Sequence, residues 1–76
     1  MSLIDLGRAH RMVGVRCRCF TAHGSSMGVV KFYGPVLFAE GEWVGVGLDT
    51  KTGRNNGGVD GIQYFEAGAA YGVFVR

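Results

Sequence analysis

The sequence predicts an all-β domain, a small and strongly bent antiparallel β-barrel with glycine-rich loops. Valine outnumbers leucine ten to four, and nine residues are aromatic; both kinds of residue suit the pleated surface of a strand. Glycine supplies 14 of the 76 residues, against about 7% in an average protein, and it permits tight turns. Short apolar segments alternate with these turns, which is typical of barrels built from many short strands.

The first twelve residues show no clean period, and we expect a flexible basic arm over residues 1–12, before the folded domain over residues 13–76. Residues 1–20 hold four arginines against Asp5, a local charge of +3, whereas the whole chain carries +2. Such an arm suits an acidic partner or nucleic acid, and it equally suits plain solvation. Composition leaves these alternatives open.

Two strands are predicted in the first half of the domain. Residues 13–20 alternate between apolar and polar or small side chains, which indicates a half-buried strand. Residues 21–26 form a turn, and residues 27–33 form the second strand, which Gly34-Pro35 ends. The buried face of the first strand is expected to hold Val13, Val15, Cys17 and Cys19.

The third strand is predicted over residues 43–48, after an apolar connector at residues 36–42. Its glycines, Gly45 and Gly47, alternate with large aliphatic residues. After Trp43, one face of this strand therefore holds only glycines, and we expect another backbone to approach it closely.

The rest of the chain alternates loops and short strands. Residues 49–58 form the longest polar loop, and Asp60-Gly61 forms a turn. A short strand at residues 63–65 and a loop of small residues at 66–70 lead to the last strand, residues 71–76, which we expect to close the barrel.

Several functional classes lack their signatures. A chain this short builds only a thin core, so no enclosed cofactor pocket and no cofactor are expected. Gly45-Val46-Gly47 lacks the third glycine and the helix of a dinucleotide site, and Arg54-Asn55 stands where a phosphate loop needs Lys-Ser/Thr. No serine elbow or acid/base pair occurs, so we expect no enzyme. The sequence also lacks a membrane span and a signal pattern.

The two cysteines are predicted to be reduced core thiols. Cys17 and Cys19 stand two apart in one strand, too far for a comfortable mutual disulfide, which favours an intracellular protein. With His10 and His23 they are the only good zinc ligands of the chain. Because strand alternation already accounts for the cysteines, we expect no metal site.

The loop around Arg54 and Asn55 is the best candidate for a binding site. Gly53 and Gly57 frame these two residues, so a guanidinium, an amide and backbone N–H groups come together. Such groups recognise a carboxylate through hydrogen bonds and charge. A plain turn accounts for Asn56-Gly57 alone, because Asn-Gly takes the left-handed conformation readily.

Three aromatic residues accompany this loop. Phe38 and Trp43 bracket the tight turn of the connector, and Phe74 lies near the end of the chain. All three could be core residues. However, Phe38 lies outside any strand, and tryptophan often keeps one edge in water. Beside an anion-binding loop, such rings would form an amphipathic groove.

At these residues the chain resembles a CAP-Gly domain, and the resemblance covers about residues 13–76. Several spaced motifs carry it in order. They are Gly28-Val29-Val30-Lys31-Phe32-Tyr33-Gly34, Phe38-Ala39-x-Gly41-x-Trp43-Val44-Gly45-Val46-x-Leu48-Asp49, Gly53-Arg54-Asn55-Asn56-Gly57, Val59-x-Gly61-x-x-Tyr64-Phe65 and Gly72-x-Phe74.

The resemblance implies a non-enzymatic microtubule-associated module that binds acidic C-terminal tails ending in an aromatic residue, Glu-Glu-Tyr or Glu-Glu-Phe. It implies the α-tubulin tail, end-binding proteins or cytoplasmic linker proteins as partners, and a cytoplasmic, cytoskeletal location on microtubules, in plus-end tracking. No membrane partner is implied. By position it assigns peptide binding to Phe38, Trp43, Arg54, Asn55, Asn56, Phe74 and Arg76.

Two residues depart from the family signature Gly-Lys-Asn-Asp-Gly. Arg54 keeps the charge of the family lysine but has a planar fork, and Asn56 replaces the family aspartate and removes a negative charge. The choice of ligand, rather than the fold, depends on these two positions. The chain also ends at Arg76, where the family usually continues a little, so we expect an excised domain or a chain that ends early.

Two other functions stay open at this stage. The domain could belong to a tubulin-folding cofactor, which the sequence of the domain alone does not distinguish. A small-barrel nucleic-acid-binding domain is the alternative from another class, and we expect it less. It would use the arginines Arg8, Arg11, Arg16 and Arg18.

Overall fold

The regular secondary structure of the described part of the chain consists of β-strands alone. The structure is a computed structural model and describes residues 13–21 and 24–76. The predicted arm, residues 1–12, lies outside the described residues. The strands of the described part are β1 (Arg16–Thr21), β2 (Gly24–Pro35), β3 (Glu42–Leu48), β4 (Gly58–Val59), β5 (Ile62–Gln63) and β6 (Gly72–Val75).

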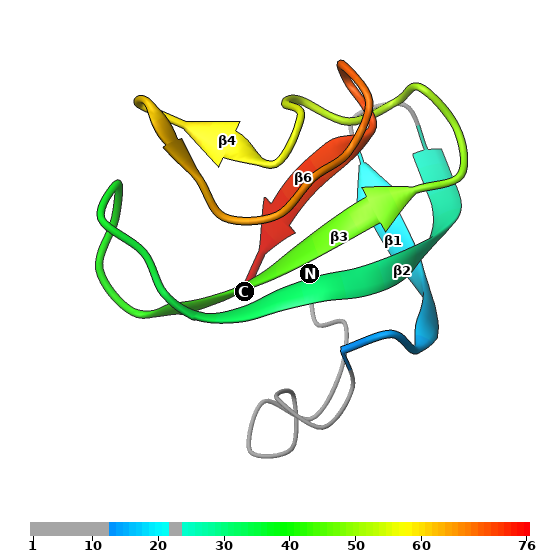
Figure 1. Ribbon diagram of the computed structural model, residues 1–76. Coiled ribbons are helices and arrows are strands. Elements are labelled where there is room, and N and C mark those ends of the chain that lie inside the picture. Colours follow the sequence, from blue (N-terminus) through cyan, green and yellow to red (C-terminus); the bar gives the residue numbers. More distant parts are fainter. Residues whose placement is uncertain (1–12, 22–23) are drawn as a thin grey trace.

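Four of these strands form one antiparallel sheet with the order β1-β2-β3-β6, and β4 and β5 form a separate two-stranded sheet. Figure 1 shows the small β4-β5 hairpin facing the strongly bent β2-β3 pair across β6. The all-β, antiparallel prediction is confirmed.

The predicted closure into a barrel is wrong. Among the described strands, β4 and β5 pair with each other, and the polar loop joins β6 through one isolated bridge, Asn55 to Gly72. The bridge does not continue into a ladder because the N–H groups that follow it are used locally: Gly57 and Gly58 donate to the side chains of Asn55 and Asn56. The result is a bent sheet with a small hairpin beside it.

The first strand begins later than predicted, at Arg16 instead of Val13. Val13 and Val15 are 51% and 40% exposed, so they do not belong to the core as expected. Gly14 lies between them with φ +94° and donates its N–H to the carbonyl of Val30, so the backbone turns here before the strand begins.

The other strands lie close to their predicted positions. β2 is longer at both ends than residues 27–33, and Pro35 ends it. β3 covers the predicted residues 43–48 and adds Glu42, and β6 covers four of the six residues expected in the last strand. The turn at Asp60-Gly61 is confirmed; both residues have positive φ, 52° and 83°, as a two-residue hairpin of the primed type requires.

One face of the four-stranded sheet holds the aliphatic core. Cys19, Val30, Val44 and Val46 are fully buried there, and the burial of each valine side chain contributes about 1.5–3 kcal/mol. Leu48 and Val73 complete the cluster, and Cys17, Tyr33 and Val75 pack against it.

The opposite face carries aromatic side chains, and a bulge in β2 adds Phe32 to them. Val30 pairs with Val46, but Phe32 pairs with Gly45, so Lys31 is an extra residue in β2. A bulge changes which face the following side chains occupy. Phe32 therefore lies over Gly45, where a Cβ would be 3.1 Å from its own Cβ, and not among the buried valines.

Side chains, and not another backbone, occupy the space over the glycines of β3. A Cβ on Gly45 would lie 2.5 Å from Cε1 of Phe65, and one on Gly47 would lie 3.2 Å from Cε of Lys31. The predicted close approach is thus present, but the approaching groups are a ring and an aliphatic chain. Gly45 in particular makes room for the aromatic layer.

Candidate functional site

Phe74 lies at the centre of an aromatic cluster on this second face. Its ring centroid is 5.1 Å from that of Phe38, 5.4 Å from that of Phe65 and 5.5 Å from that of Tyr64. Edge-to-face pairs of this kind contribute about 0.5–1.5 kcal/mol each beyond their buried area. The cluster therefore gives β6 and the loops around it a rigid apolar floor.

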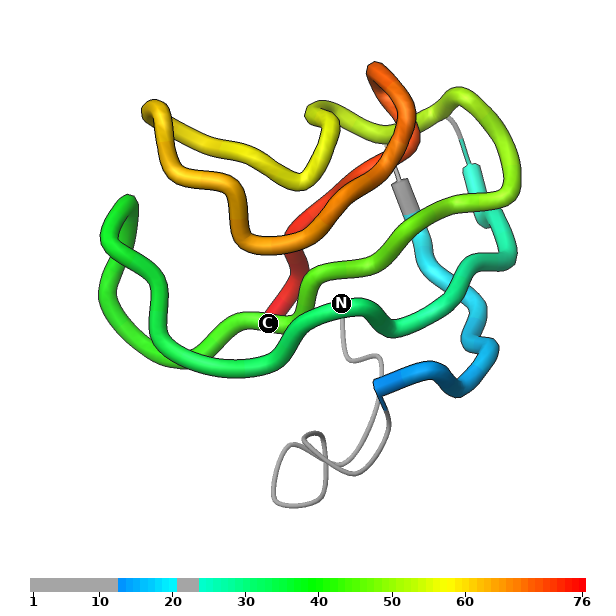
Figure 2. Tube along the Cα trace, in the orientation of Figure 1, coloured from blue at the N-terminus to red at the C-terminus, as the bar shows by residue number. Residues whose placement is uncertain are grey.

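The turn at residues 36–41 and the start of β3 place Phe38 and Trp43 beside this floor. The N–H of Leu37 donates to the hydroxyl of Tyr64 at 2.9 Å, which joins the turn to the chain after β5. The indole N–H of Trp43 donates to the carbonyl of Glu40 at 3.0 Å, and the rings of Phe38 and Trp43 lie 5.6 Å apart. Figure 2 shows the turn (green) and the hairpin (yellow to orange) on the same side of the molecule.

Backbone hydrogen bonds hold the Arg54-Asn55 segment against β6. Both N–H groups donate to the carbonyl of Gly72, at 2.8 and 3.0 Å, and the N–H of Gly72 donates back to the carbonyl of Asn55 at 2.7 Å. Gly72 has to be glycine here, because a Cβ would lie 2.6 Å from Oδ1 of Asn55. The loop is thus fixed directly beside the strand that carries Phe74.

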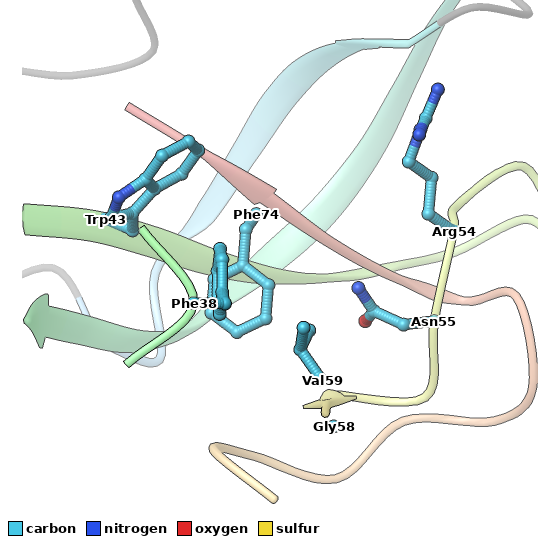
Figure 3. A pocket seen from close by; sticks show the side chains of 7 residues that line it. All are labelled: Phe38, Trp43, Arg54, Asn55, Gly58, Val59 and Phe74. Carbon is cyan, nitrogen blue, oxygen red and sulfur yellow. The ribbon is translucent and has the colours of Figure 1, made fainter. Parts of the chain in front are cut away.

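The side chain of Asn55 is oriented by its own loop. Its Oδ1 accepts the N–H of Gly57 at 2.9 Å. The amide nitrogen is therefore the end that remains for other contacts, and Figure 3 shows it directed toward the middle of the pocket. An amide nitrogen can only donate, so this position favours an acceptor such as a carboxylate.

These elements enclose an open groove of about 460 Å³. Phe38, Trp43 and Phe74 are half-buried, so the rings are neither sealed in the core nor free in solvent. In Figure 3 the three rings lie at one end and the exposed side chain of Arg54 extends from the other. The groove is lined by Phe38, Trp43, Arg54, Asn55, Gly58, Val59 and Phe74.

Five of the seven predicted site residues therefore meet at one groove, and their role in binding stays a prediction. Gly58 and Val59 also line it, although the sequence did not single them out. Their signal was weak, because a valine after two glycines is typical of any short strand beside a turn.

Asn56 and Arg76 are the two predicted residues that do not line the groove. The side chain of Asn56 accepts the N–H of Gly58 at 3.0 Å, and its carbonyl accepts from Gln63 and Ala67, so it braces the loop. Arg76 lies over the ring of Trp43, with Cζ 4.9 Å from the ring centroid, and donates to the carbonyl of Glu40 at 3.3 Å. It supports the wall of the groove from outside.

The groove has a cationic end. Arg54 is exposed and makes no ion pair within residues 13–21 and 24–76. The ion pair found in these ranges joins Arg16 to Asp49, and it lowers the pKa of the Asp49 carboxyl, mainly through the hydrogen bond from the guanidinium. Arg16 is thus already paired with an acid, whereas Arg54 is available for an anion.

The cysteines are free thiols at the sheet's aliphatic face. Burial raises the pKa of the Cys19 thiol to about 11, with a smaller contribution from Cys17, and burial also raises the pKa of Cys17. The described residues contain no cluster of ligands that would hold a metal ion, and both histidines considered as zinc ligands lie outside them. The same residues include no helix long and apolar enough to cross a membrane.

Of the four arginines assigned to a nucleic-acid surface, Arg8 and Arg11 lie outside the described residues. Arg18 is exposed on β1 and donates to the Ser25 hydroxyl at 3.4 Å.

Comparison with solved structures places this fold among CAP-Gly domains. The structure of the Bik1 CAP-Gly domain with an ETF peptide from Bim1 has a TM-score of 0.73 and 30% identity, and the match covers 93% of this chain and 83% of that one. The solution structure of the CAP-Gly domain in human Kinesin-like protein KIF13B has a TM-score of 0.65 and 46% identity, over 78% of this chain and 57% of that one.

The chain is also similar in sequence to curated proteins. A restin homolog of Drosophila melanogaster is 44% identical over 91% of this chain, and the tubulin-specific chaperone B of Caenorhabditis elegans is 44% identical over 86% of it. The chain spans only 4% and 29% of the length of these two proteins.

A family model decides the assignment. The model of the CAP-Gly domain matches residues 13–76, which include every residue that lines the groove. The chain therefore belongs to the CAP-Gly domain family.

Proposed function

We propose that this domain is a microtubule-associated binding module, and not an enzyme, which captures acidic C-terminal tails that end in an aromatic residue. The observation that carries the proposal is the groove itself, where the amide nitrogen of Asn55 and three half-buried rings face the same space. A chain terminus with a free carboxylate and a terminal ring matches both features.

The chemistry of each contact follows from the geometry. The terminal carboxylate accepts from the amide of Asn55, and the terminal ring packs against Phe38, Trp43 and Phe74. Acidic side chains before it meet Arg54. A charged hydrogen bond contributes about 1.5–3 kcal/mol, and ordering a flexible tail costs a few kcal/mol, so we expect affinity on the order of micromolar.

The comparisons support this choice of ligand. The related Bik1 domain has a structure with an ETF peptide from Bim1, a peptide with an acidic first and an aromatic last residue. By analogy, the partners of this domain are the α-tubulin tail, end-binding proteins or cytoplasmic linker proteins, and its location is cytoplasmic, on microtubules.

A second candidate, a role in tubulin folding, is favoured by the similarity to tubulin-specific chaperone B. In this role the domain uses the same groove, and only the parent protein that contains the domain is different. No observation on the described residues favours the nucleic-acid alternative.

Titration with a Glu-Glu-Tyr peptide tests the proposal. The free acid should bind at least about tenfold more tightly than the C-terminal amide, because the amide loses the charged hydrogen bond to Asn55. Equal affinity of the two peptides would remove the carboxylate mechanism.

Two neighbouring asparagines provide a matched pair of variants. Asn55→Asp keeps the acceptor for Gly57 but replaces the donor in the groove with a negative charge, so it should abolish detectable binding. Asn56→Asp adds the same charge one residue away, keeps the acceptor for Gly58 and should weaken binding only a few-fold. Equal losses in both variants would show that charge alone, and not the donor of Asn55, matters.

A further inference from the structure

The bulge in β2 gives the face with the groove a cation that the groove's lining does not include. Lys31 is the extra residue of β2, and its side chain lies on the same face as Phe32. A Cβ on Gly47 would meet Cγ, Cδ and Cε of Lys31 at 3.4, 3.9 and 3.2 Å. The aliphatic stem therefore lies across Gly47, and a side chain at Gly47 would displace it.

Gly47 is connected across the sheet with the segment Arg54-Asn55, where we propose that the carboxylate binds. Gly47 pairs with Gly72, and Gly72 accepts the N–H groups of Arg54 and Asn55. Two paired glycines, which have no side chains of their own, therefore lie between the stem of Lys31 and Asn55. On the same face, the next pair along β3 and β6 is Gly45 with Phe74, so the aromatic floor adjoins this strip.

The ammonium of Lys31 is available for a ligand. Lys31 is exposed and forms no ion pair with any residue of the described ranges. Asp49, an acid near the end of β3, is already paired with Arg16. Two exposed cations thus accompany Asn55: Arg54 is next to it in the chain, and the stem of Lys31 lies over Gly47, across the two glycines.

Strand geometry sets the distance that a ligand must cover. Neighbouring strands lie about 4.8 Å apart, so Gly47 is about 10 Å from Asn55, and an extended peptide advances about 3.3 Å per residue. A peptide whose carboxylate contacts Asn55 therefore brings its second or third residue before the terminus to Lys31.

We propose that Lys31 is a specificity residue for the ligand, which pairs with an acidic side chain two or three positions before the C-terminal residue. The inference rests on the proposed function, because it takes Asn55 as the anchor of the carboxylate. It adds a position-specific requirement for acid that neither the rings nor Asn55 imposes.

A peptide series tests this inference by titration. Four peptides end in tyrosine with a free carboxylate. One carries three glutamates directly before the tyrosine, and each of the other three has a single Glu→Gln change, at the first, second or third position before the tyrosine. Lys31→Gln removes the charge and keeps most of the stem. Arg18→Gln removes one positive charge from β1, one strand further from the groove, and serves as the matched control.

With the unchanged domain, the Glu→Gln peptides altered at the second or third position should bind about threefold more weakly, as expected for an exposed ion pair. Lys31→Gln should weaken binding of the fully acidic peptide by the same factor. In this variant, a Glu→Gln change at the second or third position should have no further effect on the affinity. Lys31→Arg should restore the preference, and Arg18→Gln should leave it unchanged.

The inference is overturned if Lys31→Gln leaves the affinity for the fully acidic peptide unchanged, or weakens acidic and neutral peptides equally. Its failure is separable from that of the proposed function. If a C-terminal amide binds as well as the acid but the dependence on Lys31 persists, the carboxylate mechanism is wrong and the role of Lys31 stands. If no peptide of the series binds, both fail.

Discussion

The ring of Phe65 lies directly over Gly45, in the space that a side chain on β3 would otherwise occupy. A Cβ at Gly45 would be 2.5 and 2.8 Å from two ring carbons of Phe65, closer than such atoms can approach. Phe65 is buried and contacts Phe74, whose ring centroid is 5.4 Å away. One glycine in the middle of the sheet therefore determines where the floor of the groove can lie.

Gly45→Ala should destabilise the domain by about 1–3 kcal/mol, because overpacking forces the ring or the backbone to move. Urea unfolding followed by circular dichroism measures the change. Leu37→Ala provides a control: Leu37 is 81% exposed, so its truncation should shift the free energy of unfolding by no more than about 0.5 kcal/mol. A Gly45→Ala domain as stable as the parent would show that Phe65 has room to move.

Trp43→Ala should weaken binding of a Glu-Glu-Tyr peptide at least about tenfold while the fold survives, because the indole forms one wall of the groove and is only half-buried. Phe20→Ala is the aromatic control; Phe20 is 59% exposed on β1 and does not line the groove. Calorimetric titration measures both. Unchanged affinity in Trp43→Ala would remove this residue from the site.

Arg76 should act through Trp43. Its guanidinium lies 4.9 Å from the ring centroid and shares the carbonyl of Glu40 with the indole N–H. Arg76→Ala should therefore change the tryptophan fluorescence of the free domain and weaken peptide binding about two- to fivefold.

Arg76→Lys separates the two possible roles of this residue. It keeps the charge but loses the planar contact with the ring, so its fluorescence should resemble that of Arg76→Ala. If Arg76→Lys instead behaves like the parent domain in both measurements, the charge of Arg76, and not its stacking, is what matters.

Much of the fold was predictable because local rules decided it. The alternation in β3 and the Asp60-Gly61 turn each follow from a few adjacent residues, and the structure confirms both. The failures arose where distant parts of the chain decide. Val13 and Val15 continue the alternation of β1, yet they are exposed, because the backbone turns at Gly14 and its N–H bonds the carbonyl of Val30 in β2.

The same division holds for the site. The loop between Gly53 and Gly57 predicted a binding role for Arg54 and Asn55, because a guanidinium, an amide and backbone N–H groups together suit an anion. No sequence pattern predicts the bulge at Lys31, because the bulge depends on the register in which β2 pairs with β3. The resemblance links Arg76 with the ligand, and this role stays a prediction. The structure adds the contact of Arg76 with Trp43, which no local pattern predicts because the two residues are far apart in the chain.

The two thiols should react at different rates. Burial raises the pKa of both, but Cys19 is fully buried with a pKa of about 11, whereas Cys17 is half-buried. Because the thiolate is the reactive form, iodoacetamide at pH 8 should label Cys17 well before Cys19, as followed by mass spectrometry of digested protein. In urea the two rates should converge. Equal rates in the folded domain would contradict the burial of Cys19.

The ion pair between Arg16 and Asp49 should make stability depend on pH in the acid range. The folded state lowers the pKa of Asp49, chiefly through the hydrogen bond from Arg16, so its stabilisation is present above the carboxyl's unfolded pKa of about 3.9. It is lost as the pH falls through the lower, folded value.

Asp49→Asn removes this titration, so the difference in unfolding free energy between the parent domain and the variant should shrink as the pH falls from 6 to 2. Because both side chains are largely in solvent, the difference should also decrease in high salt. Asp60→Asn, at an exposed turn on the other sheet, controls for the loss of one carboxylate. A constant difference across this pH range would show that Asp49 gains nothing from Arg16 in the folded domain.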